Sequence, residues 1–216
     1  VAAFVVVIVT SVATLVIIGT RRWAIREAGD RTGSFYGLVM LLVAGLAGMV
    51  VTGDLFNLFV FLEISSLAAY ALIFLGGGRA MLAGFRYLIL GTVGGSFYML
   101  GVGFLYFSTG TLNMGEMQEL LTDDASARSV QAGAALIFVG LGLKMAVVPM
   151  HLWLPDSYTF APSSVNTLIA PIMTKVGAYA MIRMFMSVFP DGYLKDVVPV
   201  ADALLVLGLF GIIFGS

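Results

Sequence analysis

Long apolar runs constrain this chain more than any other feature of its sequence. About seven of them, each close to twenty residues long, follow one another with only short polar connections between them. They lie near 1–20, 34–53, 55–77, 80–107, 129–154, 163–189 and 198–216. A helix of about 20 residues spans the hydrocarbon core of a bilayer. Because the runs lack the alternation of a membrane β-barrel, they predict membrane-spanning helices.

The composition supports the same class, since 60% of the residues are hydrophobic and only 11% are charged. We therefore expect an all-α polytopic membrane protein surrounded by the lipid bilayer. A formal net charge of −1 gives no reason to expect nucleic acid as a partner. Cysteine is absent, which excludes disulfides and thiolate metal sites. The chain starts at Val1 and stops inside an apolar run at Ser216, so we expect a fragment of a longer protein.

Basic residues gather in the short connections on one predicted side of the membrane. They are Arg21, Arg22, Arg26, Arg31, Arg79 and Arg86. Because Lys and Arg are enriched in cytoplasmic loops, we expect this side to face the cytoplasm. Arg183 is an exception, since it lies late in an apolar run toward the predicted outer side, where its long stem could snorkel to the interface.

The longest polar stretch, residues 109–128, is predicted to connect two spans on the outer side. It could hold one short surface helix near 114–121. In the span that precedes it, Gly91 and Gly95 have the small-xxx-small spacing that lets helices approach closely, and we interpret them as packing residues.

Three ionisable residues, Glu63, Lys144 and Lys175, lie deep inside apolar runs. Charged groups at that depth are costly in a bilayer, and they mark ion pathways and proton relays. Together they predict a path for charge. A structural reading stays open: Glu63 could join two helices through a hydrogen bond, and Lys144 could snorkel, although it lies too deep to do so easily.

Pro149 follows Lys144 closely in the same apolar run, and Pro155 comes soon after. A proline inside a helix removes a backbone donor and clashes with the preceding turn, so this span should kink or break just beyond Lys144. Non-helical backbone at membrane depth is tolerated where it is buried in protein or lines a wet cavity, and broken helices mark ion sites in transporters. A simple packing kink is the alternative for Pro149.

Enzymatic chemistry has little support in the sequence. His151 is the one histidine, and without cysteine it cannot build an ordinary zinc site alone. The His-Glu-x-x-His and Gly-x-Ser-x-Gly patterns and the phosphate-binding glycine loop are absent. We therefore expect no metal and no cofactor, and an intramembrane enzyme is the least favoured reading.

Three segments together resemble the antiporter-like proton-pumping subunits of respiratory complex I, of Mrp-type sodium/proton antiporters and of membrane-bound hydrogenases. The segments are 52–72 around Glu63, 142–156 around Lys144, and 173–183 around Lys175. The sequence at 53–57 and 64–66 is most similar to the Mrp-type D subunit.

The resemblance implies two inverted five-helix repeats in the complete protein. Residues 1–33 would then hold a first transmembrane helix and a cytoplasmic loop, 34–189 one antiporter-like repeat with a proline-broken helix, and 190–216 the start of the second repeat. The resemblance also implies a proton relay, in which Glu63 and Lys144 form a pair and Lys175 is the central link to the rest of the protein. His151 and Pro149 match the helix break, and His151 is included among the relay residues, with a structural role as its alternative.

The function that this resemblance implies is proton translocation, either alone or in exchange for sodium, by one subunit of a multisubunit complex. Its partners would be other membrane subunits, in a prokaryotic plasma membrane. No segment resembles a quinone pocket, a flavin site or an iron–sulfur ligand set, so redox chemistry would belong to other subunits of an NADH dehydrogenase or hydrogenase. The alternative function is a non-transporting structural anchor in the same kind of complex.

Overall fold

Helices make up nearly all of the ordered structure. The computed structural model describes residues 1–24, 29–124, 127–190, 193 and 200–215. In chain order the helices are α1 (Ala2–Trp23), the 3-10 helix η2 (Gly29–Arg31), α2 (Thr32–Val51), α3 (Leu55–Phe74), α4 (Gly78–Thr109), α5 (Met114–Asp124), α6 (Arg128–Met145), α7 (Leu154–Phe160), α8 (Ser163–Val188) and α10 (Val200–Gly215). The only β pairing in the described ranges is one isolated bridge between Asp54 and Asn113.

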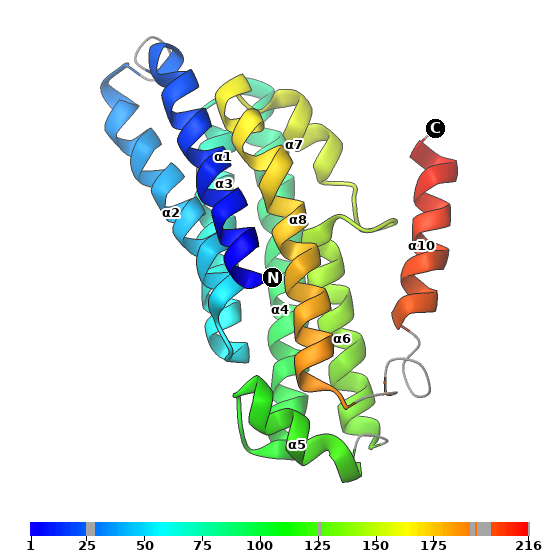
Figure 1. Ribbon diagram of the computed structural model, residues 1–216. Coiled ribbons are helices and arrows are strands. Elements are labelled where there is room, and N and C mark those ends of the chain that lie inside the picture. The colour runs from blue at the N-terminus through cyan, green and yellow to red at the C-terminus, as the bar shows by residue number, and fades with distance from the viewer. Residues whose placement is uncertain (25–28, 125–126, 191–192, 194–199, 216) are drawn as a thin grey trace.

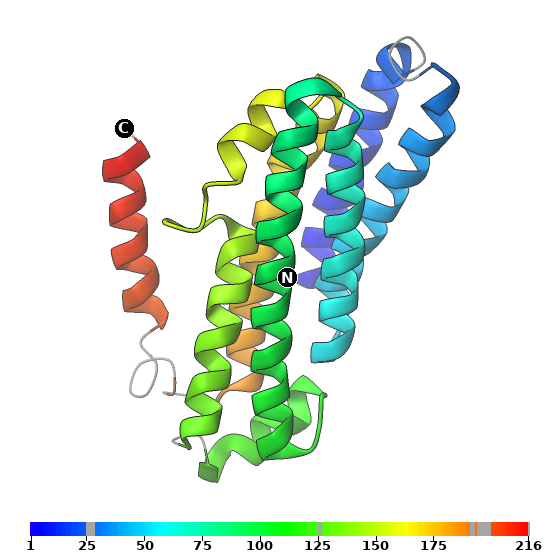
Figure 2. The same ribbon diagram turned by 180° about the vertical axis from the view of Figure 1, so that it is seen from behind.

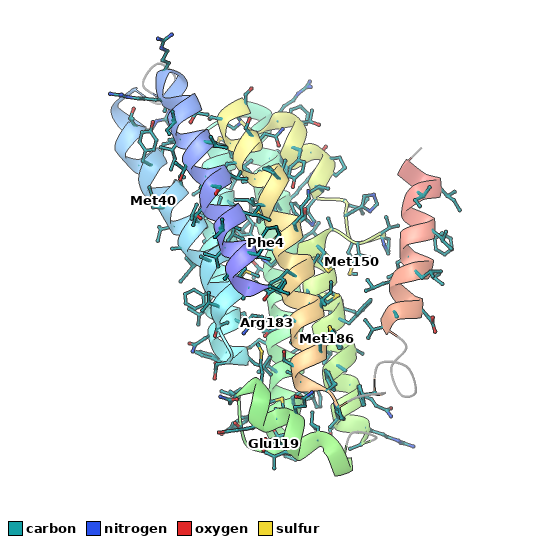
Figure 3. The ribbon with its side chains drawn as sticks, in the orientation of Figure 1. Phe4, Met40, Glu119, Met150, Arg183 and Met186 are labelled. Carbon is teal, nitrogen blue, oxygen red and sulfur yellow. The ribbon has the colours of Figure 1, made fainter. Side chains whose placement is uncertain are left out.

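Five of these helices, α1, α2, α3, α4 and α8, are long and apolar enough to cross a membrane. The predicted all-α membrane class is therefore confirmed. Large apolar side chains also remain exposed on the outside of the bundle, among them Phe4 of α1, Met40 of α2 and Met186 of α8 (Figure 3). In a polytopic membrane protein such side chains face lipid or neighbouring subunits.

The long helices run side by side as a bundle, with α5 across one end and α10 apart from the rest (Figures 1 and 2). The most extensive contact joins α4 to α6, and the next joins α2 to α3. Glycines bring the α4 and α6 backbones together: a Cβ placed on Gly140 would lie 2.6 Å from the carbonyl oxygen of Gly94. The close approach of these two helices depends on the missing side chains.

Local signals set the start of α3 and the end of α4. Asp54 caps α3, because its side chain accepts a hydrogen bond of 2.7 Å from the backbone N–H of Asn57. Gly110 ends α4 in the left-handed conformation, with φ of 73°, which glycine adopts without steric cost. The short helix predicted near 114–121 is α5, which covers one end of the bundle (Figure 1).

The α1–α2 and α3–α4 connections lie at one end of the bundle, and α5 lies at the other (Figure 1). Arg21 and Arg22 in the last turn of α1, Arg31 before α2 and Arg79 in the first turn of α4 are thus at the end of the bundle away from α5 (Figure 1). Arg26 lies outside the described residues. The cytoplasmic location of the arginine-rich end stays a prediction.

Arg183 of α8 has a role that the sequence did not indicate. Its guanidinium donates hydrogen bonds to the carbonyl oxygens of Val50 and Val51, at the C-terminal end of α2. The last carbonyls of a helix lack intrahelical partners and carry partial negative charge. The charge of Arg183 therefore caps a neighbouring helix within the bundle.

Candidate functional site

Lys144 lies in the last turn of α6 and is almost fully buried, with 5% of its side chain exposed. Its ammonium group reaches α3, where it donates a hydrogen bond of 2.6 Å to Ser66 Oγ and one of 3.2 Å to the hydroxyl of Tyr70. Ser66 in turn donates to the carbonyl oxygen of Leu62 at 2.7 Å. Lys144 does not snorkel out of the bundle, because neutral hydroxyl groups inside it bind the amine.

Glu63 is the acidic neighbour of this lysine. Its Oε1 atom lies 3.9 Å from Lys144 Nζ, which is close enough for an ion pair and too far for a hydrogen bond. The same oxygen is buried and has no hydrogen-bond partner within the described part of the chain. Glu63 and Lys144 therefore attract each other across a short gap without direct proton sharing.

The α3 residues of the site lie on one face of that helix. Glu63, Ser66 and Tyr70 are spaced i, i+3 and i+7, a pattern that places side chains in one stripe. Sequence analysis identified Glu63 alone and missed Ser66 and Tyr70. Their positions three and seven residues after Glu63, which place them on the same face of a helix, were the signal in the sequence that could have identified both.

Glycines of α4 make room for this cluster. A Cβ at Gly95 would lie 2.5 Å from Glu63 Oε1, and one at Gly91 would overlap the Tyr70 hydroxyl and lie 3.3 Å from Lys144 Nζ. These positions were interpreted as helix-packing residues. In the structure these glycines also lie beside the Glu63 carboxylate and the Tyr70 hydroxyl. A side chain at either position would not fit there.

Two spaces adjoin the pair. A groove of about 780 Å³ borders Glu63 and runs along α4; besides Glu63, its few polar side chains are Thr92, Ser96 and Ser129. A second cavity, of about 10 Å³, lies beside Lys144 and is lined by Ser65, Ser66 and apolar side chains. This smaller volume is at the lower limit of what one water molecule needs, and the side chains of Ser65, Ser66 and Lys144 are the polar groups in its mainly apolar lining.

The helix that carries Lys144 is interrupted directly after it. α6 ends at Met145, Ala146 adopts a left-handed conformation with φ of 60°, and residues 146–153 form turns before α7 begins. Pro149 lies in this segment, after a cis peptide bond from Val148. The segment bulges out of the bundle toward α10 (Figure 1), and Met150 marks it in Figure 3.

Trp153 closes the end of α6. Its indole N–H donates a hydrogen bond of 2.9 Å to the carbonyl oxygen of Leu143, which also accepts a hydrogen bond of 3.1 Å from the backbone N–H of Ala146. The indole also stacks on Tyr87 of α4, with ring centroids 3.8 Å apart. Tyr87 in turn packs edge-on against Tyr70 at 4.6 Å. Trp153 and Tyr87 were not identified from the sequence.

Within the described part of the chain, the other two predicted relay residues form no ion pair with Glu63 or Lys144. Lys175 is exposed on α8, and its amine donates a hydrogen bond of 2.8 Å to the carbonyl oxygen of Ala170. His151 lies in the segment after α6, and its Nδ1 is buried without a hydrogen-bond partner among the described residues. Of the predicted relay residues, Glu63 and Lys144 alone form an ion pair with each other in the described part of the chain.

The arrangement is suited to moving a proton between side chains. An amine and a carboxylate face each other inside the bundle; Glu63 borders a largely apolar groove, and Lys144 borders a cavity of about 10 Å³. Among the described residues, no group of three or more His, Asp or Glu side chains is placed to hold a metal ion.

Known proteins resemble this chain in sequence. A family model described as "NADH:quinone oxidoreductase/Mrp antiporter, TM" matches residues 52–216. The N subunit of the NADH-quinone oxidoreductase of Desulforudis audaxviator is 51% identical over 187 residues, which are 85% of this chain and 36% of that protein. The D subunit of the Na(+)/H(+) antiporter of Bacillus subtilis is 33% identical over 196 residues, 89% of this chain and 39% of that protein.

The fold has a solved counterpart as well. A chain of the Mrp complex from Dietzia sp. DQ12-45-1b superposes with a TM-score of 0.77 at 29% identity, over 96% of this chain and 39% of that one. The chain thus spans less than two fifths of the length of these relatives. Both kinds of complex are represented among them, and identity is higher to the oxidoreductase relative than to the antiporter relative.

Proposed function

Because this chain belongs to the NADH:quinone oxidoreductase/Mrp antiporter transmembrane family, we propose that it translocates protons as one subunit of a multisubunit membrane complex. The observation that carries the proposal is the buried Lys144, held by two hydroxyl groups and 3.9 Å from Glu63. Burying a charged lysine at this depth costs free energy, and the proton translocation suggested by the family relationship accounts for its presence.

In the proposed mechanism Lys144 binds a proton and releases it again. Attraction between two unit charges at this distance is about 4 kcal/mol for an effective dielectric constant of about 20. When the carboxylate of Glu63 is close, the ammonium form of Lys144 is favoured. When the two separate, that stabilisation is lost, and the proton leaves the nitrogen for water in the adjoining cavity.

Lys175, His151 and Pro149 complete the proposed path. Lys175 is exposed on α8 in this part of the protein, so it is available to the remainder of a longer chain. Pro149 and His151 lie in the interrupted segment after Lys144, where non-helical backbone needs water or polar partners. The buried, unpartnered Nδ1 of His151 suits such a hydrated position.

The proposed organisation follows the family. Residues 34–189 form one antiporter-like repeat of α2, α3, α4, the interrupted α6–α7 pair and α8. Residues 1–33 hold α1 and a cytoplasmic loop, and 190–216 open a second repeat with α10; both ranges are partly outside the described residues. The relatives named above suggest either an Mrp-type complex, with sodium as the exchanged ion, or a complex I-type assembly, in a prokaryotic plasma membrane.

Replacing the lysine tests the proposal. In the full-length protein assembled with its partner subunits, Lys144→Ala should lower proton translocation into proteoliposomes at least tenfold. Arg22→Ala, which removes an exposed charge at the arginine-rich end, is the control and should leave translocation unchanged. Assembly is followed by copurification of the other subunits. Full translocation by an assembled Lys144→Ala complex would favour the alternative function, a structural anchor.

A further inference from the structure

A closed ring of contacts fixes both the backbone carbonyl of Leu143 and the side-chain amine of Lys144. It runs from the Leu143 carbonyl to the Trp153 indole, across the stacked ring of Tyr87 to the ring of Tyr70, and from the Tyr70 hydroxyl back to Lys144 Nζ. The three aromatic side chains are at most 1% exposed. The position of the Tyr70 hydroxyl is therefore fixed from three segments: α3, α4 and the interrupted segment after α6.

The position of this hydroxyl has a consequence for the ion pair. A charge-assisted hydrogen bond to a carboxylate is roughly twice as strong as one between neutral groups, so an unrestrained ammonium group should close on Glu63. A shift of about 1 Å would suffice, since 2.7–3.2 Å is the normal range for N–H···O bonds. Instead the amine stays 3.9 Å from the carboxylate and bonds to Ser66 and Tyr70.

We propose that Tyr70 is a positioning residue for Lys144: its hydroxyl, fixed by Tyr87 and Trp153, holds the amine short of direct contact with Glu63. Glu63 and Lys144 therefore stay close enough to attract each other but do not form a direct hydrogen bond, so they can either associate fully or separate. This inference rests on the proposed function of Lys144 and Glu63, and it assigns Tyr70 no proton of its own to transfer.

The surroundings of Lys144 determine how the pH dependence should respond. From α3 it faces Glu63 and Tyr70, and Tyr87 of α4 lies behind Tyr70. From α2 and α8 the cavity beside it is lined by apolar side chains such as Leu46 and Met173, and by Gly177. Glu63 is thus the one charged partner among these neighbours.

Tyr70→Phe keeps the ring and its packing on Tyr87 but removes the hydroxyl. With this bond removed and only the Ser66 bond remaining, the amine of Lys144 should move toward Glu63 and retain its proton more strongly. We expect slower maximal translocation and an alkaline limb of the pH–rate profile shifted to higher pH by about half a unit, a threefold change in proton affinity. Tyr106→Phe, on an exposed part of α4, is the matched control and should leave the profile in place.

A second variant tests the cause of the shift. When Glu63→Asp is added to Tyr70→Phe, the acidic side chain is shorter by one methylene group, so its distance to the Lys144 amine should increase again. The pH–rate profile should then return toward that of the Glu63→Asp single variant. All variants are measured in the assembled full-length complex in proteoliposomes.

The outcomes separate this inference from the proposed function. If Lys144→Ala abolishes translocation and Tyr70→Phe leaves the profile unchanged or shifts it to lower pH, the positioning role is wrong and the relay stands. A lower-pH shift would mean that Tyr70 only stabilises the ammonium. If Lys144→Ala is fully active, the proposed function fails, and the positioning role fails with it.

Discussion

At the scale of single residues, the site is defined by what surrounds one buried amine. Lys144 has three N–H donors, of which two bind hydroxyl oxygens and one remains for Glu63 or for water in the small cavity. Burying a charged group without such partners would cost far more than each hydrogen bond contributes. The polar residues near Lys144 therefore matter for stability as well as for the proposed transport.

Ser66→Ala should show this cost directly. It removes the acceptor of the shorter of the two hydrogen bonds and leaves one donor of a buried charge unsatisfied, which should destabilise the protein by about 1 to 3 kcal/mol. Ser65→Ala is the matched control, because the Ser65 hydroxyl also bonds to the Leu62 carbonyl but contacts the sulfur of Met49 rather than the amine of Lys144. The measurement is the thermal unfolding midpoint of the full-length protein in detergent. Equal midpoints for the two variants would contradict the account.

At the scale of elements, the site exists because α3, α4 and α6 meet closely around it. Glycines on α4 serve two purposes: Gly94 allows the backbone of α6 to approach, and Gly91 and Gly95 leave space for the hydroxyl and the carboxylate from α3. The interruption of α6 directly after Lys144 adds turns closed by Trp153. One helix thus sets the distances among side chains from two others.

Gly95→Ala tests the role of α4. The added methyl group would lie 2.5 Å from Glu63 Oε1, so the carboxylate must move away from its present position. We expect translocation to fall about tenfold while the complex still assembles, because the carboxylate end of the Glu63 side chain can rotate where a backbone could not. Gly37→Ala on α2 is the control, since nothing lies within 4 Å of its Cβ position. Normal translocation rates in an assembled Gly95→Ala complex would show that the Glu63 position is not critical.

Much of the element scale was predictable from the sequence. Apolar length located the long helices, and prolines near Lys144 placed the interruption, because both effects are local. The contacts were not predictable in the same way: Ser66 and Lys144 are 78 residues apart, and no local signal joins them. Only the resemblance paired Glu63 with Lys144. The sequence alone indicates only packing roles for Gly91, Tyr87 and Trp153. Their positions near Glu63 and Lys144 result from the tertiary structure.

At the scale of the whole molecule, the chain corresponds to one part of longer proteins. It spans less than two fifths of the two curated relatives named above, and several of its surfaces are apolar and exposed. Lys175 is on such an exposed face of α8, and the groove beside Glu63 is open at the side of the bundle. These are the places where a relay would continue into the remainder of the protein or into a neighbouring subunit.

The central claim is that the charge of Glu63, and not merely its bulk, drives proton movement through this protein. The most direct test is the rate of proton translocation by the assembled complex in proteoliposomes when Glu63 is replaced by Gln, which has nearly the same shape but no charge. Glu119→Gln on α5 is the control at the end of the bundle. The account predicts that Glu63→Gln lowers the rate at least tenfold, that Glu63→Asp retains part of it, and that the control is fully active. An assembled Glu63→Gln complex that translocates protons at the full rate would contradict it.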